Sequence, residues 1–145
     1  MKLFLIFLSV LSAASFAEES KEAILVNQVL FEINKETVTM FDFKNYLKTK
    51  KELKSEQLLP LVQNELQEYV LYQLCDLEVQ NLDFQISDDQ QLKVASKEQQ
   101  KFLKIKKFIQ FKEKHINQLE RYKSWTDILK RKYGYIAKID ELRSN

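Results

Sequence analysis

The sequence has one glycine, one cysteine and one histidine. From so few of these residues we can assemble no metal cluster, no Gly-rich phosphate loop and no histidine-based catalytic triad. His115 lies in an apolar stripe and is interpreted as a packed or half-exposed residue rather than a general base. Cys75 has no partner for an internal disulfide and is interpreted as a buried free thiol. We expect no catalytic residues, no cofactor, no metal and no enzymatic activity.

The chain also lacks a strong excess of one charge. It has 23 Lys and Arg against 21 Asp and Glu, a formal net charge of +2. This near-neutrality argues against nucleic acid as the partner of the whole molecule.

No apolar run near the N-terminus reaches the roughly 20 residues of a membrane-spanning helix. The start instead combines Lys2, an apolar run from Leu3 to Leu11, and small residues ending in Ser15 and Ala17. These are the parts of a secretory signal peptide, with cleavage predicted after Ala17. We therefore expect residues 1–17 to be removed and residues 18–145 to form a single domain.

The most apolar helical pattern runs from about Leu58 to Leu82, with Pro60 near its start. Its apolar residues cover most of the circumference: Leu58, Leu59, Leu61, Val62, Leu66, Tyr69, Val70, Leu71, Tyr72, Leu74, Cys75 and Leu77. Only a few polar residues of this helix are predicted to face solvent. They include Glu68 and Asp76, and Glu78 is also predicted to be solvated. A helix of this kind needs packing partners on several sides.

The segments before this helix predict a hairpin and a shorter helix. A strand in the second half of 23–33 is followed by a turn at 34–36 and a return strand at 37–38. Thr39 with Asp42 forms a capping box. The helix after it places Met40, Phe43, Tyr46 and Leu47 on one face and ends in a lysine run at 48–54.

After the central helix, Ser96 with Gln99 indicates a break between two predicted helices, at about 88–95 and 97–123. One apolar stripe on the second of these helices contains Phe102, Ile105, Ile109 and Ile116, and a second contains Phe108, Phe111, His115, Leu119 and Tyr122. Two stripes indicate either burial on two sides or one face kept for a partner. Phe108, Phe111 and Tyr122 are the candidate polypeptide-binding surface. The lysines between them are typical of a solvated face, or of a helix at an anionic membrane surface.

The C-terminal part predicts a short helix and a strand. Ser124 with Asp127 reads as a capping box for a helix through Lys132, and Gly134 as its C′ residue. The alternation in Tyr135–Ile139 predicts a strand beside Val29–Ile33. The expected fold is mainly α, with a small β-hairpin or strand patch that joins the N- and C-terminal segments.

This order of elements resembles a known family. The hairpin 33–39, the helix containing Asp42, the long helix and the junction Phe84-Gln85-Ile86-Ser87-Asp88-Asp89-Gln90 are similar to the N-terminal domain of SurA-type periplasmic chaperones. In the junction, Ser87 with Gln90 forms a further capping box. The resemblance covers about residues 26–95, and Lys35 stands where the family often has a turn glycine. The C-terminal part resembles members that lack the parvulin prolyl isomerase domain.

The resemblance implies a periplasmic, SurA N-terminal-like module that serves outer membrane biogenesis and protein folding. Its expected partners are unfolded or exported polypeptides, bound through exposed apolar surface without catalysis. The alternative is a non-enzymatic envelope adaptor. Such an adaptor would bind one folded partner, or weakly contact an anionic membrane surface, through the Lys/Phe-rich helix 97–123.

Overall fold

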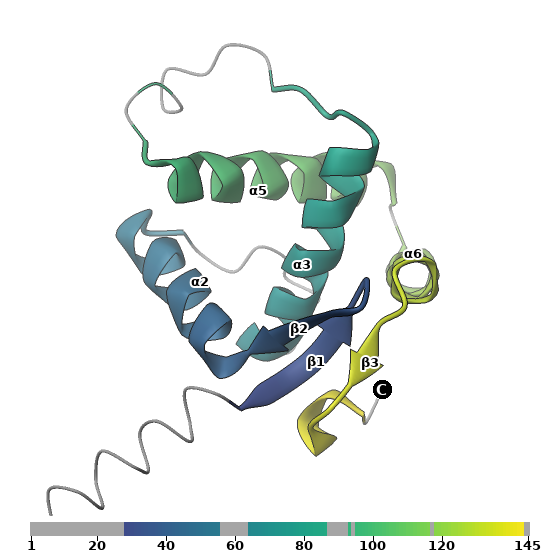
Figure 1. The fold of residues 1–145 in the computed structure, drawn as a ribbon. Helices are drawn as coiled ribbons and strands as arrows, with labels where there is room; N and C mark the ends of the chain where they lie inside the picture. Colours follow the sequence, from purple (N-terminus) through teal and green to yellow (C-terminus); the bar gives the residue numbers. More distant parts are fainter. Residues whose placement is uncertain (1–27, 56–63, 87–92, 94, 117, 144–145) are drawn as a thin grey trace, which may run out of the picture.

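The computed structural model describes residues 28–55, 64–86, 93, 95–116 and 118–143. The elements in chain order are β1 (Val29–Ile33), β2 (Glu36–Thr39), α2 (Met40–Glu52), α3 (Glu65–Asn81), α5 (Lys97–His115), α6 (Leu119–Lys132), β3 (Ile136–Ala137) and the 3-10 helix η1 (Asp140–Leu142). The strands form one antiparallel sheet in the order β2-β1-β3 (Figure 1). The predicted mainly helical fold with a small β patch is confirmed. The predicted signal peptide, Pro60, the Ser87–Gln90 capping box and most of the predicted helix at about 88–95 lie outside the described residues.

The hairpin forms because its two turn residues adopt left-handed backbone conformations. Asn34 and Lys35 have φ angles of 51° and 66°, and two consecutive positive φ values match the twist of a tight hairpin. Asn34 tolerates this conformation well, and Lys35 takes the position that glycine often fills. The Asn34 N–H also donates to the carbonyl of Tyr133 at 2.6 Å, which ties the turn to the end of α6.

Helix α2 begins as the sequence predicts. The Thr39 N–H donates to Asp42 Oδ2 at 2.8 Å, and the Asp42 N–H donates to Thr39 Oγ1 at 3.4 Å, which completes the capping box. Tyr46 is buried, and Phe43 and Leu47 pack partly buried against the core. The apolar face of α2 therefore points inward.

Helix α3 is the central element, but it begins later than predicted. Asn64 has an extended backbone and its side chain accepts a hydrogen bond from the Gln67 N–H, so the helix starts at Glu65 instead of Leu58. The described part contacts α2, α5 and α6. Its buried apolar residues are Tyr69, Val70, Leu71, Tyr72, Leu74, Cys75 and Val79. Packing on several sides is thus confirmed.

The predicted helix over 97–123 is two helices. Ser96 caps α5 with Gln99 as predicted, but α5 ends at His115, and α6 begins at Leu119 after Gln118, which makes no side-chain cap. The predicted cap at Ser124 is also wrong. Ser124 lies inside α6, where its hydroxyl donates to the Glu120 carbonyl at 2.9 Å. The change of direction lets α6 place Tyr122 and Leu129 in the core.

The predicted closure of the sheet by the C-terminal segment is confirmed. Gly134 follows α6 with φ of 60°, a conformation that glycine adopts without strain. Strand β3 then pairs with Phe31 and Glu32 of β1, and the Lys138 N–H donates to the Leu30 carbonyl at 3.0 Å. In Figure 1, β3 lies beside β1 on the edge opposite β2. The observed strand is shorter than the predicted 135–139.

Candidate functional site

The three predicted surface residues lie in different environments. Phe108 on α5 is 1% exposed and Tyr122 on α6 is 5% exposed, so both side chains belong to the core. Phe111 is 47% exposed. The expectation of one exposed surface containing all three is therefore wrong. The residues of the second stripe do not share one face: Phe108 packs in the core, Phe111 is exposed, and Tyr122 belongs to the next helix, α6.

Phe111 is the outer part of a row of aromatic rings. The Phe84 ring lies 5.2 Å from the Phe108 ring and 6.3 Å from the Phe111 ring, measured between centroids. The His115 ring lies 4.3 Å from that of Phe111 and is exposed. Phe84 comes from the link after α3, directly after Asp83, whose backbone is left-handed with φ of 46°. We call half-buried Phe84 and exposed Phe111 and His115 the Phe111 site.

Lysines surround the Phe111 site on its own helix. Lys107 and Lys114 stand four residues before and three residues after Phe111, spacings that place side chains on one face of a helix. Lys112 Nζ lies 5.5 Å from the centroid of the Phe108 ring. Cations at this end of α5 are also favoured by the helix dipole.

Carboxylates of α3 pair with the lysines of α5 and α6, which corrects the prediction that Asp76 and Glu78 are solvated. Asp76 is 9% exposed and its Oδ2 lies 2.5 Å from Lys101 Nζ. Glu78 Oε2 lies 2.7 Å from Lys132 Nζ and also accepts a hydrogen bond from the Tyr133 hydroxyl. These contacts hold α5 and α6 against α3.

The pKa of Glu78 lies below its usual value. Burial alone would raise this pKa, but hydrogen bonds from Lys132 and Tyr133 and the positive charges of Lys132 and Lys112 outweigh it. The same network raises the pKa of Tyr133, through burial and through its bond to Glu78. Tyr133 therefore stays a neutral hydrogen-bond donor, and Glu78 stays charged at neutral pH.

A second correction concerns Glu68, which the sequence pattern assigned to solvent. Glu68 is 0% exposed, and its Oε1 accepts hydrogen bonds from the Tyr46 hydroxyl at 2.5 Å and from Lys50 Nζ at 2.7 Å. Lys50, from the lysine run of α2, is itself 8% exposed. Burial and the adjacent Glu68 raise the pKa of Tyr46. This cluster fastens α2 to α3, and it was missed because its partners lie on different helices.

The remaining reactive side chains are enclosed in the core. Cys75 is a buried free thiol, as predicted, and burial raises its pKa. Among the described residues, the Tyr122 hydroxyl is the buried side-chain atom without a hydrogen-bond partner.

Within the described part of the chain no group of three or more His, Cys, Asp or Glu side chains could hold a metal ion. None of the described helices has the length and apolarity to cross a membrane.

No family model, curated protein or solved structure matches this chain.

Proposed function

We propose that this protein is an exported, chaperone-like module that binds unfolded or envelope-destined polypeptides through the Phe111 site and catalyses no reaction. The observation that carries the proposal is the exposure of Phe111 beside Phe84, in a row of rings that starts with the buried Phe108. An aromatic side chain held by packed neighbours offers apolar contact with little loss of conformational entropy.

The strength of such a contact suits transient binding. Covering the exposed part of one phenylalanine contributes about 1 kcal/mol, since full burial contributes about 1.5–3 kcal/mol. One site of this size does not discriminate strongly between apolar segments. Weak binding to many unfolded chains is therefore the mode that we propose, in line with the SurA-type resemblance.

The proposed location is the periplasm, reached through the signal peptide at residues 1–17, with a role in outer membrane biogenesis. Mass spectrometry of the native protein tests this step. We expect a chain that begins at Glu18, whereas an intact Met1 in the cytosolic fraction would contradict export.

The adaptor alternative has less support. It requires an apolar face along helix 97–123, and the structure buries the apolar residues that would form this face: Phe102, Ile105, Phe108 and Ile109. Without such a continuous apolar face, the lysines of α5 do not by themselves indicate a helix that lies on a membrane or on one folded partner. A single folded partner bound tightly by this helix would favour the adaptor over the chaperone.

The test is suppression of aggregation of a urea-unfolded outer-membrane β-barrel protein on dilution. Phe111→Ser should reduce the suppression strongly, because it removes the exposed ring of the Phe111 site. Phe41→Ser is the matched control, since Phe41 is 52% exposed on α2 and lies outside the site. Equal activity of both variants and the unmodified protein would refute the proposed site.

A further inference from the structure

Charge is distributed unevenly between two parts of the chain. Residues 97–132, which span α5 and α6, contain twelve Lys and Arg against four Asp and Glu. The described residues 28–55 and 64–86 contain six against nine. The small net charge of the whole protein therefore hides a basic region, and the field near this region favours anionic partners.

The Phe111 site lies inside this basic region. Between residues 106 and 116 the acidic residue is Glu113, against four lysines, and two of these lysines share the face of Phe111. Lys114 is exposed, and Lys107 is half-buried. A segment whose apolar side chain covers Phe111 must therefore place its neighbouring residues near lysine ammonium groups.

The fold contains an internal example of this arrangement. Helix α3 presents Asp76 and Glu78 beside the buried apolar residues Cys75 and Val79. The two carboxylates meet Lys101 of α5 and Lys132 of α6 at 2.5 and 2.7 Å. The α5–α6 region thus receives an acidic and apolar segment of its own chain through paired charges around apolar contacts.

We propose that the Phe111 site selects polypeptide segments in which an apolar side chain is flanked by carboxylates. This inference rests on the proposed function and adds a charge preference to it. A carboxylate of the segment meets the exposed Lys114 while its apolar side chain covers Phe111. Charge complementarity sets the preference, and the aromatic contact supplies the affinity that does not depend on charge.

A peptide fits these observations better than the other anionic partners do. A bilayer surface requires a helix with a continuous exposed apolar face, whereas α5 buries Phe102, Ile105 and Ile109. Single-stranded nucleic acid is usually bound by several exposed aromatic rings in a row, whereas here Phe108 is buried, Phe84 is half-buried, and Phe111 is the exposed phenylalanine of the site.

The test uses synthetic peptides of equal length, each with one central phenylalanine flanked by Glu, Ser or Lys, and measures their affinity by fluorescence anisotropy. An exposed ion pair contributes modestly, so we expect about a threefold gain in affinity for each well-placed carboxylate. The expected order is Glu, then Ser, then Lys. The differences should shrink as salt screens the charges.

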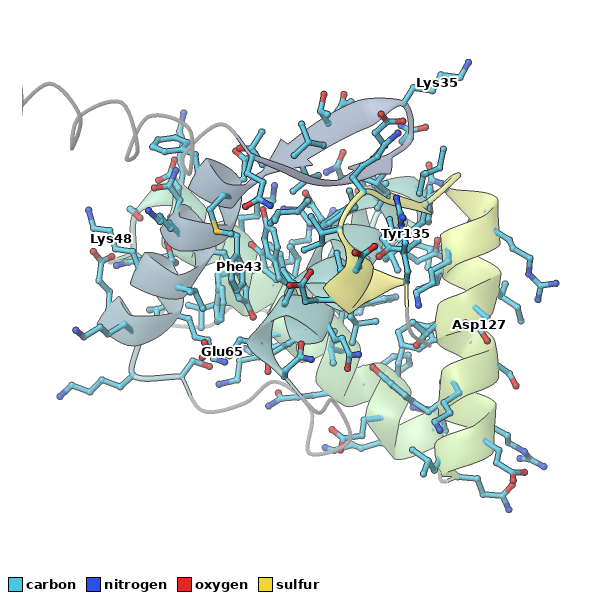
Figure 2. The ribbon with its side chains drawn as sticks, turned by 90° about the horizontal axis from the view of Figure 1, so that it is seen from below. Lys35, Phe43, Lys48, Glu65, Asp127 and Tyr135 are labelled. Carbon is cyan, nitrogen blue, oxygen red and sulfur yellow. The ribbon has the colours of Figure 1, made fainter. Side chains whose placement is uncertain are left out.

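Two variants test whether Lys114 causes the preference for carboxylate-flanked peptides. Lys114→Glu should remove or reverse the order of the three peptides. Lys44→Glu makes the same charge change on α2 and should leave the order intact. Figure 2 shows Lys48, one turn after Lys44, on the opposite side of the molecule from Asp127 of α6.

The outcomes separate this inference from the proposed function. If the three peptides bind equally and Phe111→Ser weakens the binding of all three about fivefold, the charge preference is refuted and the site stands. If Phe111→Ser changes nothing, the site itself is refuted. Displacement of the Glu-flanked peptide by phosphatidylglycerol vesicles or a single-stranded oligonucleotide, at concentrations where neutral phosphatidylcholine vesicles have no effect, would overturn the assignment to a peptide.

Discussion

The two parts of the molecule differ in the sign and the burial of their charged side chains. In the part built from β1, β2, α2 and α3, carboxylates are taken into the interior and paired there, as Glu68 is with Tyr46 and Lys50. In the part built from α5 and α6, the positive charges are numerous and most of them reach solvent. Buried ion pairs hold helices in one packing arrangement, whereas exposed charges favour the binding of oppositely charged partners. We therefore call the first part the framework, and the second part carries the proposed recognition surface.

The largest expected effect comes from removing the segment that closes the framework. Deleting residues 135–145 removes β3 and exposes β1, where Phe31 is 0% exposed and lies 5.5 Å from the Tyr135 ring. We expect the free energy of unfolding to fall by more than about 5 kcal/mol, because several apolar side chains lose their cover at once. Chemical denaturation measures this. Lys138→Ala, which removes only a partly exposed ion pair with Glu32, is the control. An unchanged midpoint after the deletion would contradict the packing of β3 against β1.

The next comparison is between two phenylalanines of α5. Phe102 is 1% exposed, and Phe102→Ala should cost about 3–5 kcal/mol of stability through the cavity that it leaves. Phe111→Ala should cost less than about 1 kcal/mol, because half of the side chain is already in water. Thermal melts of both variants test the pair. Equal losses would place Phe111 in the core and remove the candidate site.

The third-largest effect on stability is expected from removing the buried charge of Glu68. Glu68→Ala removes the hydrogen-bond acceptor of the Tyr46 hydroxyl and of buried Lys50, which keeps only Glu65 at 3.7 Å among the described carboxylates, and we expect a loss of about 3 kcal/mol. Glu68→Gln keeps an acceptor and should cost less. Lys48→Ala on the exposed face of α2 is the control, with an effect within about 0.5 kcal/mol. A fully stable Glu68→Ala protein would show that this cluster does not hold α2 in place.

The smallest effect concerns the pH dependence of stability. Because the pKa of Glu78 is lower in the folded than in the unfolded state, its contribution is complete above the unfolded-state value of about 4.3. The contribution is lost as pH falls through the lower folded-state pKa. Glu78→Gln should therefore lose stability less steeply than the unmodified protein below about pH 5, in urea denaturation at a series of pH values. Glu120→Gln, on the exposed side of α6, should follow the unmodified curve.

The sequence predicted the features that depend on near neighbours. The capping boxes at Thr39 and Ser96 and the glycine after α6 each rest on residues within a few positions, and all three are confirmed. The end of α5 was missed because no Gly or Pro marks it, and the change of direction depends on how Tyr122 and Leu129 pack against the core.

The candidate site was only partly predictable. Phe108 and Phe111 belong to the same periodic stripe, and no local signal distinguishes them. The difference arises from Phe84, whose ring contacts both of them from the link after α3. Likewise, Glu68 looks like a solvated residue until Tyr46 and Lys50 from α2 are placed beside it. Burial of a polar residue depends on partners that are distant in sequence.

The position of β1 in the middle of the sheet has a consequence for the order of folding. One neighbour of β1 follows it directly along the chain, but the other, β3, is more than a hundred residues away. During synthesis the hairpin and α2 can form early from local contacts, while the second edge of β1 stays unpaired until Ile136 and Ala137 are available. An unpaired edge is prone to wrong pairing with other chains. The cooperative step of folding should therefore follow synthesis of the C-terminal strand, after which Tyr133 can join the hairpin turn to α3.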